Sequence, residues 1–487
     1  MRSAPLGRLN RYQLTFFPYL IVFLQYVLHL FGISLSLERI AVLSPVIFFA
    51  FACLMFYFFI KETLGQPVAL MSVNIAAVLP VLTTRTMAGY VDRDALCLFI
   101  GLLSYYLYVK SYHSNDLKHR FLFSAASGFT MGALGLTWQG VALFSLVIVG
   151  VEVMRLLVQG YSRRDFYAYL CWAAPMLLVL LVVKRTYYHL NEPFAFLAVV
   201  PPILTLVLAV VHVMNSLIPH GKFKVGCILG VVIISLIVLI WLSPLQILAN
   251  LWENVNHPFG EGRLAEMIAE LKKQGLIDWY VWPGIFFFAI VIGLFGTVFR
   301  LVRSLPINAW FATLFFQVLV LGLIFSRVLS GVYASRDTFV SNIIYIISLL
   351  GLAFLIVATY VRLKLRVGRW TVIKEYHDAL FLLVYFLITL ICARSSIRFD
   401  FFFAPIEIAF GSLAIVWLLQ QQVGTNQINH VISFLVVVML IWEFFALREV
   451  LSAWPLKLWL AFAILMTFTP IAVNVRRMWI ARSSNKI

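Results

Sequence analysis

Long apolar runs, separated by short polar or basic segments, make up almost the whole of this chain. An apolar run of about 20 residues is long enough to cross a bilayer as a helix. The pattern therefore predicts an all-α, polytopic integral membrane protein of about 14–16 transmembrane helices. The predicted spans cover residues 41–60, 67–84, 95–111, 121–136, 138–158, 166–184, 194–218, 224–243, 282–300, 309–327, 340–361, 379–393, 400–420, 428–447 and 457–474.

Two stretches depart from this simple alternation. The stretch 13–33 is also apolar, but Pro18 and Gly32 interrupt it, so it is a candidate for a segment lying along the membrane surface. The one long polar excursion is the loop 244–281, which contains a run with the spacing of an interfacial helix. No soluble domain is predicted at either end, and residues 1–487 are predicted to form a single transmembrane domain.

The composition excludes an ordinary soluble protein, because 63% of the residues are hydrophobic and only 12% are charged. A net charge of +17 raises the possibility of nucleic-acid binding, but the basic residues form short clusters between the apolar runs. This is the positive-inside pattern of membrane proteins, so no nucleic-acid partner is predicted. The five cysteines do not have the spacing of metal ligands.

The basic clusters also predict the topology, since they should face the cytoplasm. Counting spans between them places the carboxylates and several arginines together on the outer face. Near the opposite, inner end of one span, Glu152 and Arg155 stand at helical spacing and are predicted either to pair with each other or to extend their charged groups to the membrane surface. The segments predicted to lie outside are the loop around Asp92, the loop 244–281, the loop 328–339 and the turn Arg394–Arg398.

Asp92 and Asp94 stand out on this outer face, because the chain has only 20 acidic residues against 37 Lys and Arg. Two carboxylates one residue apart can present several oxygen ligands to Mg²⁺ or Mn²⁺. They are equally suited to a solvated loop that starts a helix, since Asp is a good N-cap and favours the first turn. The spacing leaves both interpretations open.

Carboxylates, arginines and aromatic residues beside a wide apolar surface suit an anionic substrate carried by a lipid. Arginine binds phosphate groups in a bidentate manner, and a metal held by carboxylates can neutralise a leaving pyrophosphate. Glycosyl transfer from a lipid-linked donor needs these parts. A phospholipid transporter or a flippase needs many of the same parts, so the residues alone do not separate an enzyme from a transporter.

Three motifs in this sequence resemble motifs of the catalytic subunit of oligosaccharyltransferase. The sharpest is the second acidic motif of that family, which is similar to Arg85-Thr-Met-Ala-Gly-Tyr-Val-Asp92-Arg-Asp94. The Trp-rich turn of the family is similar to Thr137-Trp138-Gln139-Gly140, and its Arg-Phe…Ala-Pro stretch is similar to Arg398-Phe399 followed by Phe403-Ala404-Pro405. The resemblance extends over most of residues 10–475.

This resemblance implies a membrane glycosyltransferase of the GT-C type, in a bacterial or archaeal cell membrane, or in the ER membrane of a eukaryote. It would transfer a glycan from a polyprenyl (pyro)phosphate carrier to an acceptor on the extracytoplasmic face, with inversion at the anomeric carbon. The family's acceptor is an asparagine of a polypeptide, so the implied partners are a lipid-linked oligosaccharide, an acceptor polypeptide and membrane lipids. The alternatives are a related transferase with a lipid or polysaccharide acceptor, and a non-catalytic transporter or flippase.

The resemblance also implies roles for individual residues. Asp92 and Asp94 would bind Mg²⁺ or Mn²⁺, Arg85 would orient a carboxylate beside them, and Arg398 would hold the pyrophosphate. Trp138 and Arg394 are further candidates for substrate contacts, although a plain loop charge is the alternative for Arg394.

A third carboxylate is expected from the family's Thr/Ser-x-x-Glu motif in the large outer loop, where it contacts the acceptor amide and completes the metal site. Glu253 lies in the matching loop and is the favoured candidate, although Asn250 stands where the motif has a hydroxyl residue. Asp337 is the competing candidate, because it lies closer along the chain to Arg398. The third alternative is that neither residue is the equivalent carboxylate.

Two parts of the family pattern are missing from this sequence. No Asp or Glu precedes Glu38, although the family carries an acidic residue in its first outer loop. The Trp-Trp-Asp-Tyr-Gly motif of the family's soluble C-terminal domain is also missing. We therefore expect either a part of a longer or split protein, or a divergent relative that no longer reads the acceptor sequon.

Overall fold

The computed structural model describes residues 14–158, 161–183, 193–217, 279, 286–303, 308–327, 338–367 and 375–423. Within these ranges every regular element is helical, which agrees with the all-α prediction. The elements are α1 (Phe16–Leu30), α2 (Leu37–Leu64), α3 (Gln66–Val78), α4 (Pro80–Thr86), α5 (Asp94–His113), α6 (Leu117–Thr137), α7 (Val141–Val158), α8 (Arg163–Leu178), the π-helical turn η2 (Val179–Val183), α9 (Pro193–Leu217), α14 (Phe286–Arg303), α15 (Ala309–Ile324), α16 (Phe339–Val367), α17 (Glu375–Ser395), the 3-10 turn η5 (Ile397–Phe399) and α18 (Asp400–Val423).

In the part of the chain that the structure describes, eight helices are long and apolar enough to cross a membrane, or nine if the bent pair α3–α4 counts as one span. Each predicted span that falls on described residues coincides with a helix or with this pair. The predicted spans 224–243, 428–447 and 457–474 lie outside the described residues, as does the loop 244–281 apart from Trp279.

The span predicted over 67–84 is broken into two helices. Leu79 precedes a proline and adopts an extended backbone with ψ of 123°, as residues before proline usually do. Pro80 then starts α4, where its missing N–H costs no helical hydrogen bond. The two helices meet at a bend of 57°, and α4 carries Arg85 in its last turn. The break therefore directs Arg85 towards the loop that carries the acidic pair.

The apolar stretch near the start of the chain forms α1, which has only 15 residues. Pro18 does not interrupt this helix, contrary to the sequence prediction, because it lies in the first turn, where a backbone N–H has no helical partner. Gly32 follows the helix end. The ring of Phe17 packs edge-on against Phe48 of α2, with 6.3 Å between ring centroids. A helix this short falls below the length of about 20 residues that a perpendicular span needs.

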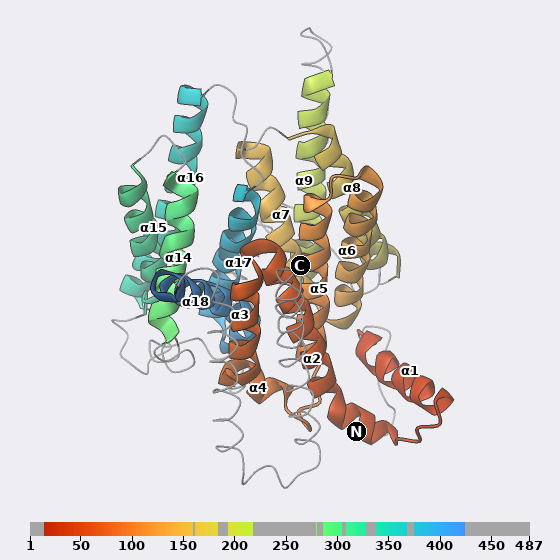
Figure 1. Ribbon diagram of the computed structural model, residues 1–487. Coiled ribbons are helices and arrows are strands. Elements are labelled where there is room, and N and C mark those ends of the chain that lie inside the picture. The colour runs from red at the N-terminus through yellow and green to blue at the C-terminus, as the bar shows by residue number, and fades with distance from the viewer. Residues whose placement is uncertain are drawn as a thin grey trace, which may run out of the picture.

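Helix α5 packs against α2 and α6, while α17, which is far away in sequence, packs against α7 and contacts α2 (Figure 1). The contact between α5 and α17 is made by aromatic rings, and fully buried Tyr105 lies at its centre. Its ring centroid is 5.1–6.0 Å from those of Phe59, Phe144, Phe381 and Tyr385. The first residue of α5 and the last residue of α17 lie at the same end of the helix bundle. This packing therefore brings the end of α17 close to the acidic pair.

The two ends of the helix bundle differ in their polar residues. At one end the loop before α5 meets the turn after α17, because Arg398 contacts Asp94. At the other end Lys110 of α5 pairs with Glu62 of α2 at 2.8 Å. We call the end with Arg398 and Asp94 the outer end, and the end with Lys110 and Glu62 the inner end, following the topology that the basic clusters predict.

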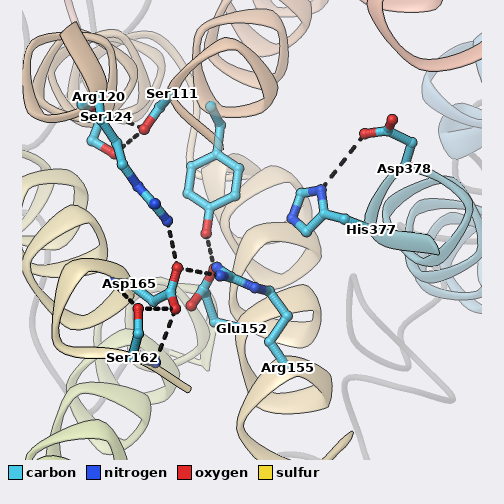
Figure 2. Close-up of polar contacts among 10 residues, drawn as sticks. Ser111, Arg120, Ser124, Glu152, Arg155, Ser162, Asp165, His377 and Asp378 are labelled. Carbon is cyan, nitrogen blue, oxygen red and sulfur yellow. Dashed lines mark hydrogen bonds and ion pairs between the residues drawn. The ribbon is translucent and has the colours of Figure 1, made fainter. Parts of the chain in front are cut away.

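A buried polar network joins four helices at the inner end (Figure 2). The Arg155 guanidinium of α7 donates to Glu152 Oε1 at 2.6 Å, which confirms the predicted pair. It also donates to Asp165 Oδ1 of α8 at 2.5 Å. Tyr108 of α5 donates to Glu152, and Arg120 of α6 pairs with Asp165. The sequence did not reveal these three contacts, because they join residues on different helices.

Asp165 also determines where α8 begins. The Ser162 hydroxyl accepts from the Asp165 backbone N–H, and the Asp165 carboxylate accepts from the Ser162 backbone N–H at 2.9 Å. This reciprocal capping box satisfies two backbone donors at the helix start. The same carboxylate thus starts α8 and ties it to α6 and α7.

Candidate active site

The loop between α4 and α5 turns at Gly89, whose φ is 96°. The Gly89 N–H donates to the Val42 carbonyl of α2 at 3.0 Å, which fixes the loop to the outer end of α2. Arg93 occupies the N-cap position of α5 without a side-chain cap, and Asp94 lies in its first turn. Neither acid is thus the N-cap itself, and Asp94 alone fits the helix-start interpretation.

Asp94 is the centre of the site. Its side chain is only 1% exposed, and each carboxylate oxygen accepts a hydrogen bond from an arginine. Arg85 Nη1 donates to Oδ2 at 3.1 Å, and Arg398 Nη2 donates to Oδ1 at 2.9 Å. A buried carboxylate is stable only when such partners offset the loss of its hydration. Asp94 therefore holds Arg85 and Arg398 together, although Arg398 lies 304 residues further along the chain.

Asp92 has a different environment, since its side chain is 33% exposed. Its Oδ1 accepts from the Arg93 backbone N–H at 2.7 Å, and its Oδ2 lies 3.6 Å from Arg398 Nη2. Partial burial and the charge of Asp94 raise the pKa of Asp92 above its ordinary value. Both causes disfavour the charged carboxylate, whereas a cation placed beside it would favour the charged form.

Arg398 is aimed by the short turn between α17 and α18. The Ser396 hydroxyl accepts from the Arg398 backbone N–H at 3.3 Å, which starts the 3-10 turn η5 before Asp400 begins α18. The Arg398 guanidinium carbon also lies 5.9 Å from the centroid of the Trp138 ring. The turn after α6, the acidic loop and the turn after α17 thus meet at one place.

Arg394, the other arginine predicted to contact substrate, is buried and points to different helices. Its Nε donates to the Ser326 hydroxyl at 2.9 Å, and its guanidinium carbon lies 3.8 Å from the centroid of the Tyr345 ring. Its carbonyl accepts from Arg327 Nη1 at 2.7 Å. These contacts tie the end of α17 to α15 and α16. The substrate role of Arg394 remains a prediction.

Sequence reasoning missed two arginines near the site. Arg93 Nη1 reaches the Thr137 carbonyl at 3.5 Å and so links the acidic loop to the end of α6. Arg327 is buried at the outer end of α15. Its position directly after a long apolar run was a usable signal, because charged residues bordering a span are costly and usually have a role.

Metal binding by this site stays a prediction. Among the described residues no group of three or more His, Cys, Asp or Glu side chains is arranged to hold a metal ion. Asp92 is suited to be a metal ligand, because its carboxylate is partly exposed. Both oxygens of Asp94, in contrast, bind arginines. Glu253 and its competitor Asp337 lie outside the described residues.

Replacing Gly89 by alanine should destabilise the protein by about 1–2 kcal/mol, because a side chain strains a backbone at this φ. No atom lies within 4 Å of the position of an added Cβ, so the cost comes from the backbone alone. Thermal unfolding of the purified protein measures it. Gly296→Ala is the control, since Gly296 has equally open space but lies inside α14, where alanine is favoured by up to about 1 kcal/mol. Equal unfolding midpoints for both variants would contradict the role of Gly89.

Comparison with known proteins assigns the first half of the chain to one family. Residues 1–250 match the family described as "Oligosaccharyl transferase STT3, N-terminal". The chain is 31% identical over 212 residues to the dolichyl-diphosphooligosaccharide–protein glycosyltransferase subunit STT3A of Oryza sativa, covering 43% of this chain and 26% of the relative. It is 30% identical over 193 residues to the STT3B subunit of Arabidopsis thaliana, covering 39% and 25%.

Solved structures give the same fold over nearly all of the chain. The archaeal oligosaccharyltransferase AglB from Archaeoglobus fulgidus, in complex with an inhibitory peptide and a dolichol-phosphate, has a TM-score of 0.53 and 15% identity, covering 93% of this chain and 47% of AglB. The apo form of the Archaeoglobus enzyme has the same TM-score, 14% identity, and coverage of 92% and 47%. The predicted polytopic membrane fold is therefore confirmed. The chain spans about a quarter of the length of the curated relatives it matches and about half of these structures.

Proposed function

Because this chain belongs to the family described as Oligosaccharyl transferase STT3, N-terminal, we propose that it transfers a glycan from a polyprenyl pyrophosphate carrier to an asparagine of an acceptor polypeptide. The reaction takes place at the outer end of this integral, multi-pass membrane protein. The names of the two plant relatives, which describe transfer from a dolichyl diphosphate to protein, support this proposal.

The observation that carries the proposal is the pair of arginines gathered by Asp94 beside the partly exposed Asp92. Phosphate groups bind well to guanidinium groups, and a divalent cation binds well to carboxylates. A pyrophosphate with its cation needs both kinds of group side by side. A transporter for an uncharged lipid would need neither.

In this proposal Arg398 binds the donor pyrophosphate, and Asp92 is a ligand for Mg²⁺ or Mn²⁺. Asp94 and Glu253 are the other predicted ligands, and the contacts of Asp94 support a second role, which is to keep Arg85 and Arg398 in place. A bound divalent cation would supply positive charge that stabilises the leaving pyrophosphate.

During transfer the acceptor amide nitrogen attacks the anomeric carbon of the donor sugar. The bond between that carbon and the pyrophosphate oxygen breaks, and the polyprenyl pyrophosphate leaves with the bonding electrons while the nitrogen loses a proton. Arg398 binds the charged pyrophosphate both before and during the transfer. Glu253 is predicted to accept hydrogen bonds from the acceptor amide and so to orient it.

The test uses this chain alone, reconstituted in lipid with Mn²⁺, a polyprenyl pyrophosphate carrying a labelled glycan, and an asparagine-containing peptide. We expect labelled glycopeptide that requires the peptide asparagine and disappears when the metal is chelated. A different result, transbilayer movement of the donor with its pyrophosphate intact and without metal, would identify a flippase instead. Label found on a lipid or polysaccharide acceptor would identify a related transferase.

A further inference from the structure

We propose that Trp138 is a positioning residue for Arg398, and that Gly140 provides the space that its indole ring needs. The inference deepens the proposed function, since its consequence for donor binding rests on Arg398 holding the pyrophosphate. It assigns to Trp138 a supporting role in place of the direct substrate contact that the sequence suggested.

The Trp138 ring has a fixed position under the site. It is only 3% exposed and stacks on Phe402 of α18 with ring centroids 4.8 Å apart and planes inclined by 20°. Phe399 approaches it from the preceding turn at 6.4 Å. The Trp138 backbone N–H donates to the Leu134 carbonyl at 2.8 Å, so the residue also ends α6. A sugar ring that stacked on this indole would need an exposed face, which the ring does not offer.

The Arg398 guanidinium lies over this ring. Its carbon is 5.9 Å from the ring centroid, within the range of about 6 Å in which a cation is attracted to an aromatic face. Asp94 accepts from the same guanidinium at 2.9 Å, and Asp92 lies 3.6 Å away. The long and flexible arginine side chain is thus held between an aromatic ring and two carboxylates. Holding it in one orientation before the donor binds removes an entropic cost of binding.

The position of the Trp138 ring explains why the turn after α6 has a glycine at position 140. A Cβ atom at this position would lie 2.3 Å from atoms of the Trp138 indole, far closer than atoms without a bond between them can approach. Any side chain at position 140 must therefore displace the ring. Gly140→Ala should disturb Arg398 in the same way as a change of Trp138 itself, although residue 140 is not the residue that contacts the arginine.

The first experiment measures Arg398 directly and needs no substrate. The full chain in detergent is treated with phenylglyoxal, which modifies accessible guanidinium groups, and the labelled fraction of the Arg398 peptide is determined by mass spectrometry. We expect Trp138→Ala and Gly140→Ala to raise the labelling rate at least about threefold, and Trp138→Phe to stay near the original rate because a phenyl ring keeps an aromatic face. Trp417→Ala is the control, since Trp417 lies on α18 with its side chain exposed.

The second experiment separates positioning from catalysis. With the donor varied at saturating peptide, we expect Trp138→Ala to raise the donor KM about tenfold, the factor for one well-placed cation–aromatic contact, and to change kcat less than about threefold. Trp138→Phe should restore most of the loss. An unchanged labelling rate in both Trp138→Ala and Gly140→Ala would overturn the proposal, as would a fall in kcat at constant KM that phenylalanine does not rescue.

The two experiments also distinguish this inference from the proposed function. In one outcome, the chain without substitutions transfers no glycan, while the labelling rate of Arg398 still changes in Trp138→Ala and Gly140→Ala as expected. In that case the positioning role stands and the proposed function fails. Size-exclusion profiles identify any variant that does not fold. Should Trp138→Ala be lost in this way, Gly140→Ala and Trp138→Phe still give opposite expected results for labelling.

Discussion

Replacing Asp92 by alanine is expected to lower glycan transfer by at least about 100-fold, because it removes the carboxylate best placed to hold a divalent cation. Asp92 is the partly exposed member of the acidic pair, whereas Asp94 is buried between two arginines. The initial rate of transfer measures the effect. The signal of free Mn²⁺ in electron paramagnetic resonance measures metal binding in the same samples, and we expect it to rise because less Mn²⁺ is bound.

The matched control for this experiment is Glu38→Ala. Glu38 is also an acidic residue at the outer end, but it is exposed in the first turn of α2. Its removal tests whether any loss of negative charge at this end weakens metal binding, and we expect it to leave both measurements near their original values. A rate and a Mn²⁺ affinity for Asp92→Ala that match those of Glu38→Ala would remove Asp92 from the site.

Replacing Arg155 by alanine is expected to destabilise the protein by about 3–5 kcal/mol, the usual effect of removing one partner from a buried ion pair. Glu152 is fully buried and Asp165 is nearly so, and both lose their contact with Arg155 in this variant, while Asp165 keeps its pair with Arg120. Arg155 also lies 4.6 Å from the centroid of the Tyr112 ring, so its removal leaves a gap in packing as well. Thermal or denaturant unfolding in detergent, followed by circular dichroism, measures the change.

Arg163→Ala is the control for Arg155→Ala. Arg163 begins α8 at the same inner end but is exposed, and surface substitutions of this kind usually change stability by no more than about 0.5 kcal/mol. The pair of variants separates the buried network from a general loss of positive charge at the inner end. Equal stability of the two variants would mean that the network in Figure 2 contributes little to the fold.

The helices were largely predictable from the sequence. Apolar runs of the right length identified the spans from α2 to α18 that lie on described residues, because a chain in a bilayer must satisfy its backbone hydrogen bonds within each helix. Two details depended on proline. Pro18 was expected to interrupt α1 but lies in its first turn, and Pro80 divides a predicted single span into α3 and α4. The effect of a proline depends on its place within a helix, which an apolar pattern does not reveal.

Parts of the candidate site were also visible in the sequence. The motif from Arg85 to Asp94 indicated the family, which the match of residues 1–250 confirms. The sequence did not show that Arg398 binds Asp94, that Trp138 lies under Arg398, or that Arg155 reaches Asp165. These contacts join different helices, and helical spacing carries information only about neighbours on one helix.

By itself, the sequence determined that this protein is a multi-pass helical membrane protein whose acidic motif and arginines belong to one end. Hydrophobic length and the distribution of basic residues are sufficient for that conclusion. Only the tertiary structure decided that Asp92 and Asp94 differ in exposure and in their arginine contacts, since their spacing in the sequence does not distinguish one from the other. Aromatic packing of α17 against α5 brings Arg398, in the turn after α17, onto Asp94, which buries that carboxylate and leaves Asp92 as the accessible one. The difference arises because burial and charge pairing depend on which helices meet.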